Sequence, residues 1–287
     1  MLENKTVKGA LCLIISAFFF ALMGLFVQLS GDLPSVQKSF FRNIIAVIVA
    51  GAVLIKEGKG FIWKKGSLVP LLLRSVFGLI GVLCNFYALD RLILSDALML
   101  NKLSPFFAVI LSFLVLKEKI TLFQFSMVIM AFIGSLFIIK PTPELLNTAS
   151  IFGLIGGLGA GAAYTMVRKL AANGERNSYI VFFFSFFSCV VVLPYLIFNY
   201  VEMSLFQLIV LILAGICAAL GQFSITAAYS YAPAREISVY DYTQVIFTTI
   251  MSFIVFGTVP DILSVAGYVV ICSATIIMFL KNKGKSA

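Results

Sequence analysis

Three charged side chains, Arg42, Lys102 and Asp241, lie well inside long apolar runs of this sequence. Apolar residues make up 61% of the 287 positions, charged residues only 11%, and the mean hydropathy is +1.09. An ionised side chain at the centre of a bilayer costs roughly 2.5–3.5 kcal/mol even on the most lenient scale. Charges kept at that cost usually face water, a partner or a solute, so we expect a membrane protein with a polar path through it.

Lys102 lies too deep in its apolar run to reach either membrane surface easily, and Asn101 and Pro105 flank it. Two interpretations are open. The ammonium lines a cavity and binds an anionic group, or it forms a buried salt bridge with Asp96 or Asp241. Pro105 removes one backbone hydrogen bond, so a kink is expected in this region.

The segment around Asp241 repeats polar residues on one helical face, because Gln244 and Thr248 follow it at i+3 and i+7. Tyr240 is its neighbour in the chain. The carboxyl group could carry a coupling proton, neutralise Lys102 or bind a substrate ammonium. A polar packing contact between helices is the structural alternative.

Arg42 lies about two turns inside its apolar run, and Lys38 precedes it by about one turn. We expect Lys38 to extend to the membrane surface, and Arg42 either to do the same or to clamp a carboxylate or phosphate with its planar fork. Arg74 is expected to be a surface anchor. The predicted substrate-binding residues are Lys102, Asn101, Arg42, Asp241, Tyr240, Gln244, Gln222, Asn85 and Tyr164.

Ten apolar runs, each near the length that crosses a bilayer, must position these residues. They cover residues 9–29, 36–55, 68–89, 92–116, 122–139, 150–166, 180–198, 204–228, 237–255 and 262–280. The runs are continuous rather than alternating, which argues against a transmembrane barrel. The first run is longer than a typical signal-peptide core and nine more follow, so cleavage is not expected. We predict an all-α integral membrane protein with ten transmembrane helices.

The basic residues indicate an orientation. With the N-terminus in the cytoplasm, fifteen Lys and Arg residues fall in inner segments, against Arg91 and Lys140 in outer loops. We therefore predict a multi-pass protein of the cell membrane with both termini cytoplasmic. Orientation and anionic lipid account for the net charge of +9, and a nucleic-acid partner is not expected.

Metal and cofactor chemistry find little support in the sequence. The chain contains no His, and its five Cys residues lie singly within the apolar runs without a CxxC pair. No phosphate-binding, dinucleotide-binding or nucleophile motif is present. We expect no metal and no cofactor, and neither an enzyme nor an ATP-driven pump.

The loop 140–150 contains two prolines and divides the chain into halves, 1–140 and 141–287, of five apolar runs each. An odd number of spans per half inverts the second half relative to the first, as in many transporters. When the chain is shifted by 140 residues, Asn101 aligns with Asp241, so polar residues fall on polar residues.

The segment 103–125 resembles the repeat-ending signature of EamA-type permeases in the drug/metabolite transporter superfamily. Pro105 and Glu118 occupy the proline and acidic positions of that signature, whereas the second half has Val245 and Thr258 there. The resemblance implies ten helices in two inverted repeats, cytoplasmic termini, a central cavity and alternating access.

We expect a secondary-active carrier of a small polar organic metabolite, with amino acids and organic acids favoured. Lys102 and Arg42 would bind its negative group, and Asp241 would bind an ammonium or carry a coupling proton. The expected partners are this solute, the lipid bilayer and protons, with the chain a monomer or homodimer. One alternative is a proton-coupled exporter of lipophilic cations, in which Asp241 and tyrosines bind the drug. A membrane enzyme or lipid-handling protein is the other.

Overall fold

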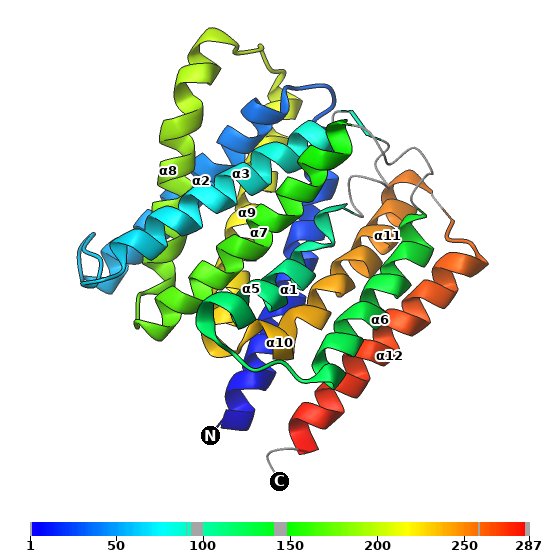
Figure 1. Cartoon of the computed structure of the whole chain (residues 1–287). Helices are drawn as coiled ribbons and strands as arrows, with labels where there is room; N and C mark the ends of the chain where they lie inside the picture. The colour runs from blue at the N-terminus through cyan, green and yellow to red at the C-terminus, as the bar shows by residue number, and fades with distance from the viewer. Residues whose placement is uncertain (1, 90, 93–99, 141–147, 258, 285–287) are drawn as a thin grey trace.

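The structure is a computed structural model that describes residues 2–89, 91–92, 100–140, 148–257 and 259–284. All regular elements in these ranges are helical (Figure 1). The first half contains α1 (Leu2–Leu29), α2 (Ser35–Glu57), α3 (Leu68–Leu89), α5 (Ser104–Leu116) and α6 (Leu122–Ile139). The second half contains α7 (Thr148–Ala172), α8 (Asn177–Phe198), α9 (Leu205–Tyr231), α10 (Ala234–Ile237), the 3-10 helix η1 (Ser238–Tyr242), α11 (Thr243–Phe256) and α12 (Ile262–Gly284).

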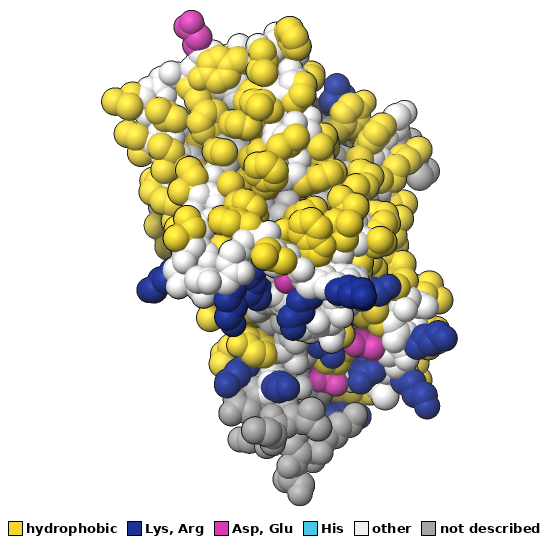
Figure 2. Space-filling view, turned by 90° about the vertical axis from the view of Figure 1, so that its left-hand side faces the viewer, with side chains coloured by type: hydrophobic (Ala, Val, Ile, Leu, Met, Phe, Trp, Pro, Cys, Tyr) yellow, Lys and Arg dark blue, Asp and Glu magenta, His cyan; other side chains and the backbone are white. Residues whose placement is uncertain are grey.

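The outer surface of the bundle is apolar. Among the described residues, nine helical segments are long and apolar enough to cross a membrane, and α5 is a shorter apolar helix. Figure 2 shows hydrophobic side chains over most of one face, with Lys and Arg gathered in a band toward the end that carries the termini. Exposed large apolar residues recur along most of the long helices, and an apolar surface of this extent indicates a membrane environment. The predicted all-α membrane fold is confirmed.

The helices pair across the two halves in a symmetric pattern. α1 packs on α9 and α3 packs on α7, so each pair becomes the other when the halves are exchanged. The contacts of α5 with α7 and of α11 with α1 are related in the same way, and α6 packs on its counterpart α12. Both termini lie at the same end of the bundle (Figure 1). This is the packing expected of two inverted repeats.

Small residues on α7 allow two of these helix pairs to approach closely. A methyl group added to Gly159 would lie 2.8 Å from the carbonyl oxygen of Phe77 in α3. One added to Gly161 would lie 2.6 Å from Cβ of Phe107 in α5. Backbone contact of this kind is how membrane helices gain van der Waals attraction without a hydrophobic driving force.

The predicted span 92–116 is interrupted in its described part, before the position where the kink at Pro105 was expected. Residues 100–101 are helical, 102–103 form a turn, and α5 begins only at Ser104. Pro105 therefore lies in the first turn of a helix, where its missing N–H is not needed, and not at a mid-helix kink. Residues 93–99, including Asp96, lie outside the described residues.

The corresponding segment of the second half is also irregular. The predicted helix 237–255 begins as α10, passes through the 3-10 helix η1 and continues as α11. Asp241 lies within η1, at the position that aligns with Asn101 beside the turn of the first half. Discontinuous helices of this kind offer unpaired backbone groups to a buried polar site.

Candidate functional site

A cavity of about 540 Å³ lies between the two halves of the bundle. It reaches from Gln222 of α9 and Asp241 of η1 to the exposed residues Gly31 and Asp32, which connect α1 to α2. That connection lies at the end of the bundle away from the termini (Figure 1). The volume is in the range of sites for small metabolites, and the lining mixes apolar and polar side chains as such sites do.

Seven of the nine predicted site residues line this cavity: Arg42, Asn85, Asn101, Tyr164, Gln222, Asp241 and Gln244. They come from helices that are far apart in the sequence, α2, α3, α7, α9 and α11, and from the two irregular segments. Lys102 and Tyr240 are not among the lining residues. Tyr240 is buried in the apolar core, with 3% of its surface accessible.

Of the two interpretations of Lys102, the structure shows the buried salt bridge, with Asp241 as the partner. Its ammonium is 2.9 Å from Oδ2 of Asp241 and 2.6 Å from Oε1 of Gln244, and only 3% of the residue is accessible. The hydroxyl of Tyr242 donates to the carbonyl oxygen of Lys102 at 3.0 Å. The two irregular helix segments are therefore tied together at the inner end of the cavity.

Arg74 differs from its prediction as a surface anchor. The residue is 2% accessible, lines the cavity and donates from Nη2 to Oε1 of Gln222 at 3.2 Å. Its guanidinium carbon lies 4.0 Å from the ring centroid of Phe184. A methyl group added to Gly78 would lie 2.3 Å from Nη1, so the glycine one turn along α3 makes room for the folded-back side chain. Gly78 was the one sequence signal that could have indicated this.

Positive charge is in excess around the cavity. Its described lining contains the cations Lys38, Arg42 and Arg74 and the carboxylates Asp32 and Asp241. Asp241 is already neutralised by Lys102, and Asp32 lies at the exposed mouth. Within the described part of the chain, no carboxylate is within ion-pair distance of Arg42 or Arg74. A buried guanidinium without a counter-charge has the charge and the planar donor geometry that suit a carboxylate or phosphate.

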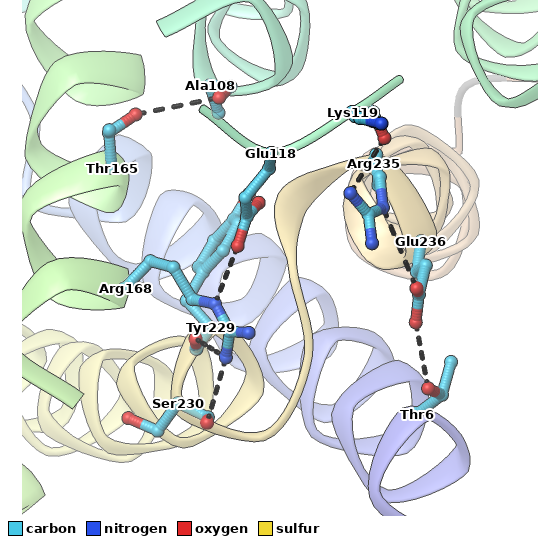
Figure 3. A network of polar contacts seen from close by, with 10 residues as sticks. All are labelled: Thr6, Ala108, Glu118, Lys119, Thr165, Arg168, Tyr229, Ser230, Arg235 and Glu236. Carbon is cyan, nitrogen blue, oxygen red and sulfur yellow. Dashed lines mark hydrogen bonds and ion pairs between the residues drawn. The ribbon is translucent and has the colours of Figure 1, made fainter. Parts of the chain in front are cut away.

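Below the cavity, the end of the bundle that carries the termini is held closed by polar contacts, the termini-side network (Figure 3). Arg168 of α7 pairs with Glu118, 3.1 Å from Nε to Oε1, and donates from Nη1 to the carbonyl oxygen of Ser230 at 3.3 Å. Arg235 donates to the carbonyl oxygen of Lys119 at 2.7 Å. The network also includes Glu236, which accepts from Thr6 at 2.8 Å.

A pair of tyrosines lies between the cavity and this network. Tyr164, which lines the cavity, stacks on Tyr229 with ring centroids 5.0 Å apart, and Tyr229 is fully buried. The backbone carbonyl of Tyr229 is itself a contact of Arg168 (Figure 3). Among the described residues, stacked rings followed by ion pairs lie between the cavity and the termini side, and the cavity lining reaches exposed residues at the α1–α2 connection.

Comparison with known proteins gives two matches to one family along this chain. The EamA-like transporter family matches residues 7–140 and again residues 147–280. The pseudopaline exporter CntI of Pseudomonas aeruginosa is 30% identical over 280 residues, 96% of this chain and 98% of the exporter. The riboflavin transporter of Vibrio cholerae is 26% identical over 269 residues, 90% of this chain and 88% of that transporter.

A solved structure, titled only as the crystal structure of a protein, superposes with a TM-score of 0.82. It covers 96% of this chain and 98% of its own, at 14% sequence identity. At that identity the likeness concerns the fold alone.

Proposed function

The chain belongs to the EamA-like transporter family, and we propose that it carries a small polar organic anion across the cell membrane by alternating access. The favoured cargo bears a carboxylate, as amino acids and organic acids do. The observation that carries the proposal is the pair of buried guanidiniums, Arg42 and Arg74, in a cavity whose carboxylates are elsewhere engaged or exposed.

The same charge distribution disfavours the lipophilic-cation exporter. Such an exporter needs a carboxylate or aromatic faces that are free to contact the drug. Here Asp241 is held by Lys102, and Tyr240 is packed in the core. Tyr164 does line the cavity, but the excess of positive charge around it would repel a cation. The relatives are an exporter of pseudopaline and a transporter of riboflavin, which supports an organic metabolite as cargo and leaves the direction of transport open.

In the proposed mechanism the halves 1–140 and 141–287 rock around the cavity. The structure corresponds to the state open away from the termini, which is outward-open if the basic band marks the cytoplasmic side. The termini-side network must separate to admit the opposite state, while the Lys102–Asp241 pair stays near the pivot. Asp241 would carry a coupling proton, because opening of the Lys102–Asp241 pair during this movement would leave the carboxylate uncompensated.

Uptake into proteoliposomes tests this function. Purified protein is reconstituted, and uptake of radiolabelled amino acids and organic acids is measured with and without a pH gradient. Arg42→Gln and Arg74→Gln should each lower uptake at subsaturating solute about tenfold or more, because a hydrogen bond to a charged group contributes about 1.5–3 kcal/mol. Arg91→Gln, which removes an exposed arginine outside the cavity, should transport normally. Inhibition by quaternary amines but not by carboxylates would contradict the proposal.

A further inference from the structure

Two guanidiniums, not one, face the cavity without an acidic partner among the described residues. Arg42 comes from α2 and Arg74 from α3, and both are more than nine-tenths buried. Both line the same cavity as Tyr164, so each guanidinium lies in the electrostatic field of the other. We propose that the cavity selects solutes with two separate anionic groups, one for each guanidinium. This inference rests on the proposed function and defines its substrate class.

Arg74 is positioned by its surroundings before any solute binds. Gln222 of the second half accepts a hydrogen bond from Nη2, the Phe184 ring lies against the guanidinium, and Gly78 leaves space for it. The Nε of Arg74 is buried and has no hydrogen-bond partner. A buried donor without a partner is costly, and a carboxylate oxygen near this edge of the guanidinium would satisfy it.

Arg42 supplies the second point of attachment. Its side chain lines the cavity, and among the described groups it makes no hydrogen bond or ion pair that would fix it. A solute with one carboxylate can compensate only one of the two cations and leaves the other buried and uncompensated. A solute with two carboxylates compensates both and removes their mutual repulsion. A bidentate pair at each end would also fix the solute's orientation.

The neutral polar residues of the cavity suit the remainder of such a solute. Asn85 and Asn101 offer amide donors and acceptors, and Tyr164 offers a hydroxyl in the same cavity as the two guanidiniums. The Lys102 ammonium is already bonded to Asp241 and Gln244, so it is not the primary anion site. The two arginines therefore determine how many negative groups the solute carries.

Matched pairs of small acids test the inference on the full-length protein in lipid nanodiscs. Succinate, glutarate and adipate are compared with succinamate, glutaramate and adipamate, which keep the length but replace one carboxylate by an amide. Affinity is read from the ligand-dependent rise in melting temperature. The best diacid should bind at least tenfold more tightly than its monoamide.

Variants of the two arginines test whether they cause the difference in affinity between a diacid and its monoamide. Arg42→Gln and Arg74→Gln should each reduce the diacid preference to less than about threefold, because one arginine then accepts either compound equally. Arg91→Gln, at an exposed position, should keep the full preference. If Arg74→Gln does not fold, Gly78→Ala gives the same test, because it displaces the guanidinium while keeping its charge. Size-exclusion chromatography and the melting temperature without ligand confirm folding.

The outcomes separate this inference from the proposed function. Equal affinity for diacids and monoamides would overturn the two-point site and leave an anion carrier in place. Tight binding of phenyl phosphate, a dianion with a single anionic group, with no diacid preference would overturn it too. If none of the carboxylates binds and none is taken up by proteoliposomes, the proposed function itself fails.

Discussion

Replacing Lys102 by Met removes the ammonium of the buried salt bridge while keeping an unbranched side chain of similar length. The lost contacts are those to Oδ2 of Asp241 at 2.9 Å, to Oε1 of Gln244 at 2.6 Å and to the carbonyl oxygen of Asp241 at 3.3 Å. Both members of the pair are at least nine-tenths buried. Removing one partner of a buried pair costs about 3–5 kcal/mol, because the other charge remains without compensation.

The partner variant defines the interaction energy. Asp241→Asn leaves the Lys102 ammonium with Gln244 and a backbone carbonyl, so it should cost less than Lys102→Met. The double variant should be less destabilised than the sum of the single variants by about 2 kcal/mol or more, since it contains no uncompensated charge. Such coupling would show a direct energetic interaction between two residues that are 139 positions apart in the chain.

The assay is unfolding by SDS in mixed micelles. The loss of helix is monitored by far-UV circular dichroism. Wild type, the two single variants, the double variant and Lys56→Met, an exposed lysine at the end of α2, are compared. Lys56→Met should change the free energy of unfolding by less than about 0.5 kcal/mol. The reasoning would be refuted if each single variant lowered the free energy of unfolding by less than about 1 kcal/mol and the double variant lowered it by the sum of the two.

Three further predictions follow from other parts of the molecule. Arg168→Gln should weaken the termini-side network by about 1 kcal/mol, because its ion pair with Glu118 is partly exposed. This should shift the equilibrium roughly fivefold toward the state that is open at the termini side. Distances between spin labels across that end would report the shift, and an unchanged distance distribution would show that the network does not hold this end closed. Gly78→Ala should cost about 1–3 kcal/mol by overpacking, whereas Gly24→Ala, with no atom within 4 Å of the added carbon, should not lower the melting temperature. The hydrogen bond and charge of Lys140 and the backbone N–H of Ser264 hold the pKa of Asp261 at about 2. Because that pKa is depressed, its contribution to stability is complete above about pH 4 and is lost as pH falls through about 2; an NMR titration giving an ordinary value near 4 would contradict this.

The spans could be predicted from hydropathy because a bilayer lets the backbone satisfy its polar groups only in a helix or a closed barrel, and continuous apolar runs are typical of the helix. In the described part of the chain, nine long apolar helices follow predicted runs, and α5 covers the second half of the run 92–116. The irregular segments around Lys102 and within η1 could not be predicted in the same way. Their residues are apolar enough for helix, and the broken backbone is stabilised by contacts such as Tyr242 to Lys102, which join segments 140 positions apart.

The candidate site was predicted in composition more than in arrangement. Seven of the nine predicted residues line one cavity, since charge and amide groups inside apolar runs have few other places to lie. Two residues, however, depended on their partners. For Lys102, whose role was left open, the structure shows a salt bridge with Asp241. Arg74, which was expected at a membrane surface, points into the cavity instead.

The sequence by itself determined that this chain is a helical membrane protein with buried charge, because the cost of placing apolar runs in water and charges in lipid is independent of the fold. Tertiary structure alone decided which charges neutralise each other and which remain for a solute. An arginine such as Arg74 can reach the surface or the interior from the same position on α3. The outcome was set by the space at Gly78 and by Phe184 and Gln222 on other helices.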